Sequence, residues 1–251
     1  MQKKEDADAV TGIQGASVDG MPQIQDSGYG SASGSQRMDL PSVVSGPQIR
    51  LEVGPYTTYT DVALALMGGW TLNNEQSLAV LLPAAFLDAR GPRLQEEEGP
   101  QHLQYVGGEG GTGKSRVFHA LRDMFRLKRI QHTLLLTGAS GNAAALIGGV
   151  TIHSAANIGF GNDSGPPRRI SEEEKLRWKS KVMLVIDEVN QVGGLTLAAV
   201  DSRLRQYRDD GQRPFDGIPI VVFFGDFYQE DKDFSYVYVP VLYALPNYIR
   251  K

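Results

Sequence analysis

The nine-residue stretch GGEGGTGKS, residues 107–115, constrains the fold more than any other part of the chain. It contains the spacing GxxxxGK[ST], in which four residues separate Gly108 from Gly113, and Lys114 and Ser115 follow directly. Glycines let backbone N–H groups turn toward phosphate oxygens, and a helix that begins at the loop presents its positive end there. The alternative is a chance glycine-rich turn. The apolar LQYV before the loop and the amphipathic stretch after it favour a phosphate-binding loop between a strand and a helix.

Each position of this loop has a chemical role if it binds a nucleotide. The loop residues that we assign to nucleotide binding are Gly108, Gly110, Gly111, Thr112, Gly113, Lys114 and Ser115. The ammonium group of Lys114 would reach the β and γ phosphates, and the hydroxyl group of Ser115 would ligate Mg²⁺. The loop therefore predicts a nucleotide and a magnesium ion as cofactors.

Apolar runs alternate with helical patterns along the rest of the chain. The runs are LQYV before the loop, TLLL at 133–136, VMLVI at 182–186 and IPIVVFF at 218–224. Helical patterns are found at 114–127, in NAAALIGG, at 195–207 and, before the loop, at 73–87, where we expect Pro83 to kink or split the helix. Strands that alternate with helices predict an α/β fold, a P-loop NTPase with a buried parallel sheet flanked by helices.

Polar groups follow two of the later apolar runs. VMLVI ends in Asp187 and Glu188, where one carboxylate can hold the water shell of magnesium and the other can deprotonate an attacking water. The last run is followed by Gly225, Asp226 and Gln229, and an amide at that place could contact the γ-phosphate. Taken alone, the two acids are a solvated strand end and the second segment is a turn. Together with the loop, Lys114, Asp187, Glu188 and Gln229 form the predicted catalytic set.

Composition excludes several other kinds of site. The chain has no cysteine, which rules out disulfides and thiolate metal sites, and its four histidines show no ligand spacing. A net charge of −4 gives no global basic field, so any contact with nucleic acid must come from local patches. No apolar run approaches the roughly 18 to 20 residues that span a bilayer, and we expect no membrane partner.

The chain divides into three regions by composition. Residues 1–48 are rich in Gly, Ser, Gln and Asp and predict a disordered tail. Residues 49–71 form a flanking element of uncertain structure, and residues 72–251 form the predicted ATPase domain.

Five segments in this order resemble the Pif-type DNA helicases of the RecD-like branch of superfamily 1, particularly the helicase portion of Helitron transposons. They are LNNEQ at 72–76, GEGGTGKS at 108–115, TGASGNAAALIGGVTIHS at 137–154, VIDEVNQV at 185–192 and GDFYQ at 225–229. The segment VIDEVNQV departs from the family pattern, because Asn190 and Gln191 stand where Ser and Met are usual.

The resemblance implies a RecA-like ATPase domain that binds ATP and Mg²⁺ and grips single-stranded DNA. It implies that Gln76 contacts adenine and Gln229 senses the γ-phosphate. The DNA-facing residues that it implies are Thr151, His153 and Ser154, although a single histidine is more often structural. It further implies roles in DNA unwinding, repair, recombination or telomere maintenance, and a location in the nucleus.

The family's second RecA-like domain, which would supply an arginine finger, is not found before Lys251. An arginine finger is worth on the order of 10³ to 10⁵ in hydrolysis rate, so we expect slow ATP turnover unless a partner, such as a second RecA-like domain in trans, supplies the arginine. One alternative is a catalytically impaired nucleotide-dependent binding module, or a transposon-derived remnant without unwinding activity. Another P-loop enzyme, such as a small-molecule kinase or a GTPase, is a further alternative, but neither an arginine-rich lid nor an NKxD motif is visible.

Overall fold

The structure, a computed structural model, describes residues 51–91, 94, 99–158, 170–208 and 213–226. All of them belong to the compact unit Ser45–Lys251. The predicted tail at 1–48 and the predicted phosphate sensor Gln229 lie outside the described residues.

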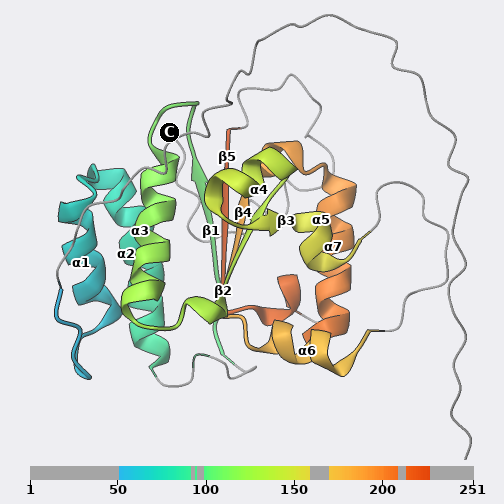
Figure 1. Cartoon of the computed structure of the whole chain (residues 1–251), viewed down its shortest axis with the longest axis horizontal. Coiled ribbons are helices and arrows are strands. Elements are labelled where there is room, and N and C mark those ends of the chain that lie inside the picture. Colours follow the sequence, from blue (N-terminus) through green and yellow to red (C-terminus); the bar gives the residue numbers. More distant parts are fainter. Residues whose placement is uncertain (1–50, 92–93, 95–98, 159–169, 209–212, 227–251) are drawn as a thin grey trace, which may run out of the picture. The chain divides into compact units, whose positions relative to one another are not determined.

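A sheet of five parallel strands forms the centre of this unit (Figure 1). The strands are β1 (His102–Gly107), β2 (Leu134–Gly138), β3 (Val150–Thr151), β4 (Met183–Asp187) and β5 (Ile220–Gly225). Their spatial order is β1-β5-β4-β2-β3, and every described pairing is parallel. The predicted α/β fold with a parallel sheet is confirmed, and all four apolar runs form strands because their side chains are buried on both faces.

Helices cover both faces of the sheet (Figure 1). One side carries α1 (Tyr59–Gly69), α2 (Asn74–Arg90) and α3 (Lys114–Leu127), and the other carries α5 (Ile152–Ala156), α6 (Glu172–Lys179) and α7 (Gly194–Arg208). The short α4 (Gly141–Ile147) follows β2, and single 3₁₀ turns occur at Gln131–Thr133, Val189–Gln191 and Pro214–Gly217. Two apolar cores result, one on each side of the sheet.

Helix α3 follows the predicted amphipathic pattern. Its residues Val117, Leu121 and Phe125, spaced by four, are at most 1% exposed and lie in the core shared with α1 and α2. This packing holds the first turn of α3 directly after the glycine-rich loop.

The sequence predicts that Pro83 kinks or splits its helix, and it does not split it, because helix α2 continues through Pro83. A proline has no N–H, and the carbonyl group of Ala79, four residues earlier, therefore loses its helical partner. The side chain of Gln104 on β1 takes that place, because its Nε2 donates to the Ala79 oxygen at 3.1 Å. Gln104 is completely buried, and its Oε1 lies 2.8 Å from Nε2 of His102. A side chain from the sheet thus satisfies the carbonyl that proline leaves open.

Helix α1 lies within residues 49–71, for which the sequence predicts no definite structure, and it begins at a capping box. The Thr58 side chain accepts from the N–H of Asp61, and the Asp61 carboxylate accepts from the N–H of Thr58. Its buried face, which includes Val62 and Leu66, joins the core of α2 and α3.

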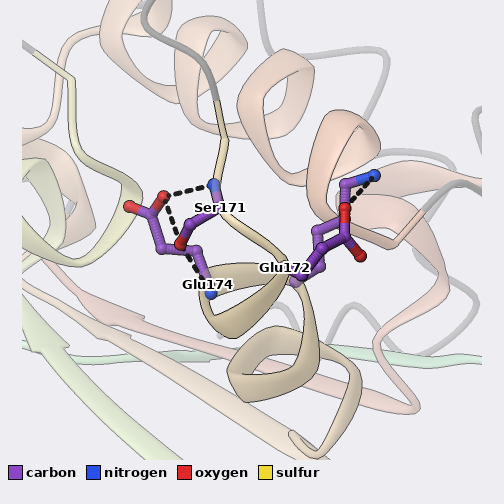
Figure 2. Close-up of polar contacts among 4 residues, drawn as sticks. Ser171, Glu172 and Glu174 are labelled. Atoms are coloured by element: carbon purple, nitrogen blue, oxygen red, sulfur yellow. Dashed lines mark hydrogen bonds and ion pairs between the residues drawn. The ribbon is translucent and has the colours of Figure 1, made fainter. Parts of the chain in front are cut away.

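Helix α6 begins in the same way. Figure 2 shows the reciprocal bonds between Ser171 and Glu174, in which the N–H of Ser171 donates to the Glu174 carboxylate at 2.9 Å. Trp178 at the other end of the helix is buried and stacks on Tyr207 of α7, with ring centroids 5.6 Å apart. The capping box stabilises the start of this charged helix, and the aromatic contact packs its other end against α7.

Candidate nucleotide-binding site

The carboxyl ends of the strands meet at one edge of the sheet. Gly107 of β1 lies opposite Gly225 of β5, and Asp187 of β4 lies opposite Gly138 of β2. Because β5 stands between β1 and β4, two strand spacings, or about 10 Å, separate the start of the loop from Asp187. Open parallel sheets bind ligands outside the carboxyl ends of their strands, and this edge is therefore the candidate site.

The loop after β1 needs glycine at several positions. Gly111 and Gly113 have φ of 81° and 87°, in the left-handed region that side chains disfavour. A Cβ on Gly108 would lie 2.6 Å from Oγ1 of Thr112, which donates to the carbonyl group of Glu109 at 2.7 Å. The glycines therefore let the loop close on itself with its backbone exposed toward a ligand.

Lys114 lies inside the curve of this loop. Its Nζ donates to the carbonyl oxygen of Gly108 and, at 3.2 Å, to that of Glu109. Helix α3 starts at Lys114 after Gly113, which provides no side-chain cap, and Ser115 is exposed on the first turn. The helix end thus offers N–H groups, an ammonium and a hydroxyl at one place, which suits a phosphate group.

Asp187 and Glu188 end the neighbouring buried strand. Burial raises the pKa of Asp187, a hydrogen bond from the backbone of Glu188 lowers it, the Glu188 carboxylate raises it and the nearby Lys114 ammonium lowers it. Because Lys114 affects the pKa of Asp187, the acidic strand end lies within electrostatic reach of the loop. Glu188 has φ of 53° and ψ of 45°, a left-handed conformation that is uncommon for a residue with a side chain. Backbone strain of this kind clusters at functional sites, which supports a role for the Glu188 side chain.

Asn190, noted in the sequence only as a departure from a family pattern, connects two of the site's segments. Its Oδ1 accepts from the N–H of Asp226 at 3.3 Å, and Asn190 is 2% exposed. A Cβ on Gly225 would lie 2.9 Å from the same oxygen. The acidic segment after β4 is therefore tied to the segment after β5, which leads toward Gln229. Only the contact between two strand ends reveals this role, and no local sequence signal points to it.

Gln76, predicted to contact adenine, lies beside the loop. Its Nε2 donates to the carbonyl oxygen of Thr112 at 3.0 Å, while its Oε1 accepts from the N–H of Asn73. The structure thus brings Gln76 together with the phosphate loop, although the two are 36 residues apart in sequence.

The predicted DNA-facing residues lie elsewhere. Thr151 ends β3, the edge strand on the far side of the sheet from β1, and it caps α5 by accepting from the N–H of Ser154 at 3.2 Å. Three strands separate β3 from the strand that enters the loop, so Thr151 and Ser154 do not share the phosphate site. His153 is half-buried in the first turn of α5.

A protein-only metal site is not found in the described part of the chain, where no three His, Cys, Asp or Glu side chains gather around a point. Magnesium typically binds through one or two carboxylates together with substrate phosphates. Asp187 offers such a carboxylate at the acidic strand end, and Ser115 offers a hydroxyl oxygen beside the predicted phosphate position. Among the described residues no helix combines the length and the apolar character needed to cross a bilayer.

Comparisons with known proteins agree on one family. The family model described as PIF1-like helicase matches residues 94–230, which is more than half of the chain. An ATP-dependent DNA helicase PIF1 of Emericella nidulans is 39% identical over 130 residues, covering 49% of this chain and 17% of that protein. The ATP-dependent DNA helicase PIF1 of Saccharomyces cerevisiae is 33% identical over 165 residues, covering 63% of this chain and 18% of that protein.

A solved structure of unliganded Pif1 from Bacteroides is 28% identical, with a TM-score of 0.46, and the match covers 63% of this chain and 32% of the other. The chain spans less than a fifth of the length of each of the two curated relatives, those of Emericella nidulans and Saccharomyces cerevisiae. The matched region contains the phosphate loop, the acidic strand end and β5. Four of the five short segments that resemble the family lie within this matched region, and the chain belongs to the PIF1-like helicase family.

Proposed function

We propose that this chain contributes an ATP-binding and ATP-hydrolysing domain that acts on single-stranded DNA. The observation that carries the proposal is the arrangement of the loop: Lys114 lies within its curve, at the start of a helix, and is electrostatically coupled to Asp187. Family membership and the name that the curated relatives share, ATP-dependent DNA helicase, support the same activity.

The loop residues would hold the phosphates of ATP. Backbone N–H groups at the start of α3 would bind phosphate oxygens, and the Lys114 ammonium would exchange its bonds to the carbonyls of Gly108 and Glu109 for bonds to the same phosphates. That exchange is favourable because an ionised acceptor binds an ammonium more strongly than a neutral carbonyl does. Gln76 stands at the edge of the loop where a nucleobase would extend from the phosphates.

Ser115 and Asp187 are the residues that would hold Mg²⁺, which would neutralise charge on the phosphates. A metal ion would also stabilise the ionised form of Asp187, whose pKa burial raises. Glu188, the next residue in the chain, is the group that would accept a proton from the attacking water. Gln229, outside the described residues, stays the predicted γ-phosphate sensor.

Single-stranded DNA is the proposed polymer partner, and the segment with Thr151, His153 and Ser154 is its proposed contact. The support is the family resemblance together with the exposure of Ser154 on α5, which follows the edge strand β3 directly. A second RecA-like domain that supplies an arginine is the partner we propose for rapid turnover and for unwinding. Roles in DNA repair, recombination or telomere maintenance in the nucleus belong to the same proposal.

ATP hydrolysis by the full chain, measured with and without single-stranded DNA, tests this function. We expect slow phosphate release that DNA increases and that Glu188→Gln abolishes while Mg-ATP still binds. Lys175→Ala, which removes a lysine on α6 paired with Glu172, is the matched control and should leave the rate unchanged. Binding of ATP without any phosphate release, with or without DNA, would identify a binding module instead of an ATPase.

A further inference from the structure

The start of α2 and the turn before it contact the phosphate loop at one point and the first turn of α3 at another. At one point Gln76, in the first turn of α2, donates from Nε2 to the carbonyl oxygen of Thr112 at 3.0 Å. At the other, Nη1 of Arg116, the residue after Ser115, donates to Oγ1 of Thr71 at 3.2 Å. The loop is therefore held from outside as well as by its own backbone.

The network around Gln76 determines which end of its amide faces the loop. Oε1 accepts from the N–H of Asn73 at 3.0 Å and Nε2 faces the Thr112 carbonyl, so exchanging the two ends would place donor against donor and acceptor against acceptor. One N–H and one lone pair of the amide then stay available for a base. Holding Thr112 and contacting a base are thus compatible roles of the same side chain.

The loop has been shaped around this amide. A Cβ on Gly113 would lie 2.5 Å from Nε2 of Gln76, so a side chain at this position would displace the amide, and the φ of 87° at Gly113 also disfavours one. Thr112, whose carbonyl Gln76 holds, lies between the left-handed Gly111 and Gly113, where the chain turns toward a ligand. Moving that carbonyl would rotate the adjoining peptide N–H groups away from the phosphate position.

Thr71, which accepts from Arg116, has a strained backbone conformation. Its φ of 49° is a rare value for a β-branched residue, and its Oγ1 both donates to the Trp70 carbonyl at 2.8 Å and accepts from Arg116. A strained conformation persists only where its surroundings determine it, and here those surroundings are the neighbouring carbonyl and the first turn of α3.

We propose that Gln76 is a positioning residue of the phosphate loop, acting on the Thr112 carbonyl independently of any contact with a nucleobase. The proposal rests on the proposed function, because it assumes that the loop binds phosphates. It predicts that Gln76 contributes to the binding of a ligand that has phosphates but no base.

Magnesium tripolyphosphate is such a ligand, and calorimetric titration of the full chain with it and with Mg-ATP tests the proposal. Gln76→Met removes the donor with little change in size, and we expect it to weaken tripolyphosphate binding about 2- to 10-fold, the range for one net hydrogen bond. Asn73→Ala is the matched control. It removes the Asn73 side chain that caps α2 but keeps the contact between Gln76 and Thr112, and it should leave tripolyphosphate affinity unchanged.

Gln76→Glu provides a second variant that keeps the capping box at the start of α2 and so preserves the helix. It lacks the donor to Thr112 and should also weaken tripolyphosphate binding. Asn74→Asp adds the same charge two residues earlier in α2 and keeps the Gln76 donor to Thr112, and its smaller effect measures the contribution of charge.

Two results would overturn the positioning role. One is weaker ATP binding with unchanged tripolyphosphate binding in Gln76→Met, which would make Gln76 a base reader only. The other is an equal loss in Gln76→Met and Asn73→Ala, which would trace the effect to the stability of the helix end. Failure of the unmodified chain to bind either ligand would overturn the proposed function itself, and this inference with it.

Discussion

The buried contact between Gln104 and the helix carbonyl opened by Pro83 predicts a specific energetic coupling. Pro83 gives Ala79 no helical partner, and Gln104 supplies one from β1, the strand that leads into the phosphate loop. Gln104 is therefore needed because Pro83 leaves this carbonyl without a helical partner. Replacing Pro83 by Ala restores an N–H that can bond the Ala79 carbonyl and makes Gln104 less necessary.

The size of the coupling follows from the burial of the groups. Gln104→Met removes the donor at a site with no solvent access, and leaving a buried carbonyl unsatisfied costs about 1–3 kcal/mol. In the Pro83→Ala background the carbonyl keeps a partner, so the same substitution should cost about 1–3 kcal/mol less. The loss of the contact with His102 is common to both backgrounds and cancels in the comparison.

Urea unfolding of the four proteins in this double-mutant cycle measures the coupling. Thermal midpoints should show the same difference, at about 2–4 °C per kcal/mol for a domain of this size. Ala89→Gly, at an exposed position of α2, is the control and should be additive with Gln104→Met. Additivity of Pro83→Ala and Gln104→Met within about 0.5 kcal/mol would refute the reasoning.

Three further predictions follow from individual groups. Burial raises the pKa of Asp187, so its carboxylate is protonated at a higher pH than an exposed aspartate would be. As pH falls through that range, Mg-ATP affinity measured by calorimetry should fall. Asp187→Asn should remove the Mg²⁺ dependence of binding without lowering the thermal midpoint. Asn190→Leu should slow DNA-stimulated hydrolysis more than it weakens ATP binding, since it releases Asp226; equal effects would contradict this. Burial lowers the pKa of His102, so unfolding takes up a proton and the free energy of unfolding should fall as pH drops below about 6.5. If His102→Gln leaves the pH dependence of that free energy unchanged, this prediction is wrong.

The central architecture was predictable because its signals are local. Each apolar run is buried on both faces of the sheet, so composition alone marked it as a strand, and α3 shows its buried face as a spacing of four. The capping box of Ser171 and Glu174 before α6 is a local signal as well, and reading it would have located that helix.

The remaining features depend on contacts between distant segments. The continuity of α2 through Pro83 depends on Gln104, 25 residues from the carbonyl it satisfies. The role of Asn190 depends on a strand that begins 30 residues later in the chain, and that of Gln76 on a loop 36 residues away. Propensity and spacing carry no information on such pairs, so the site's supporting contacts emerged only from the folded chain.

Binding of Mg-ATP by the full chain is the most direct test of the central claim, that residues 107–115 form a working phosphate site. Calorimetric titration should show binding at one site, which Lys114→Ala abolishes while the thermal unfolding profile stays that of a folded protein, because Lys114 is only half-buried. Absence of any binding to the folded, unmodified chain, or equal affinity in Lys114→Ala, would contradict the account.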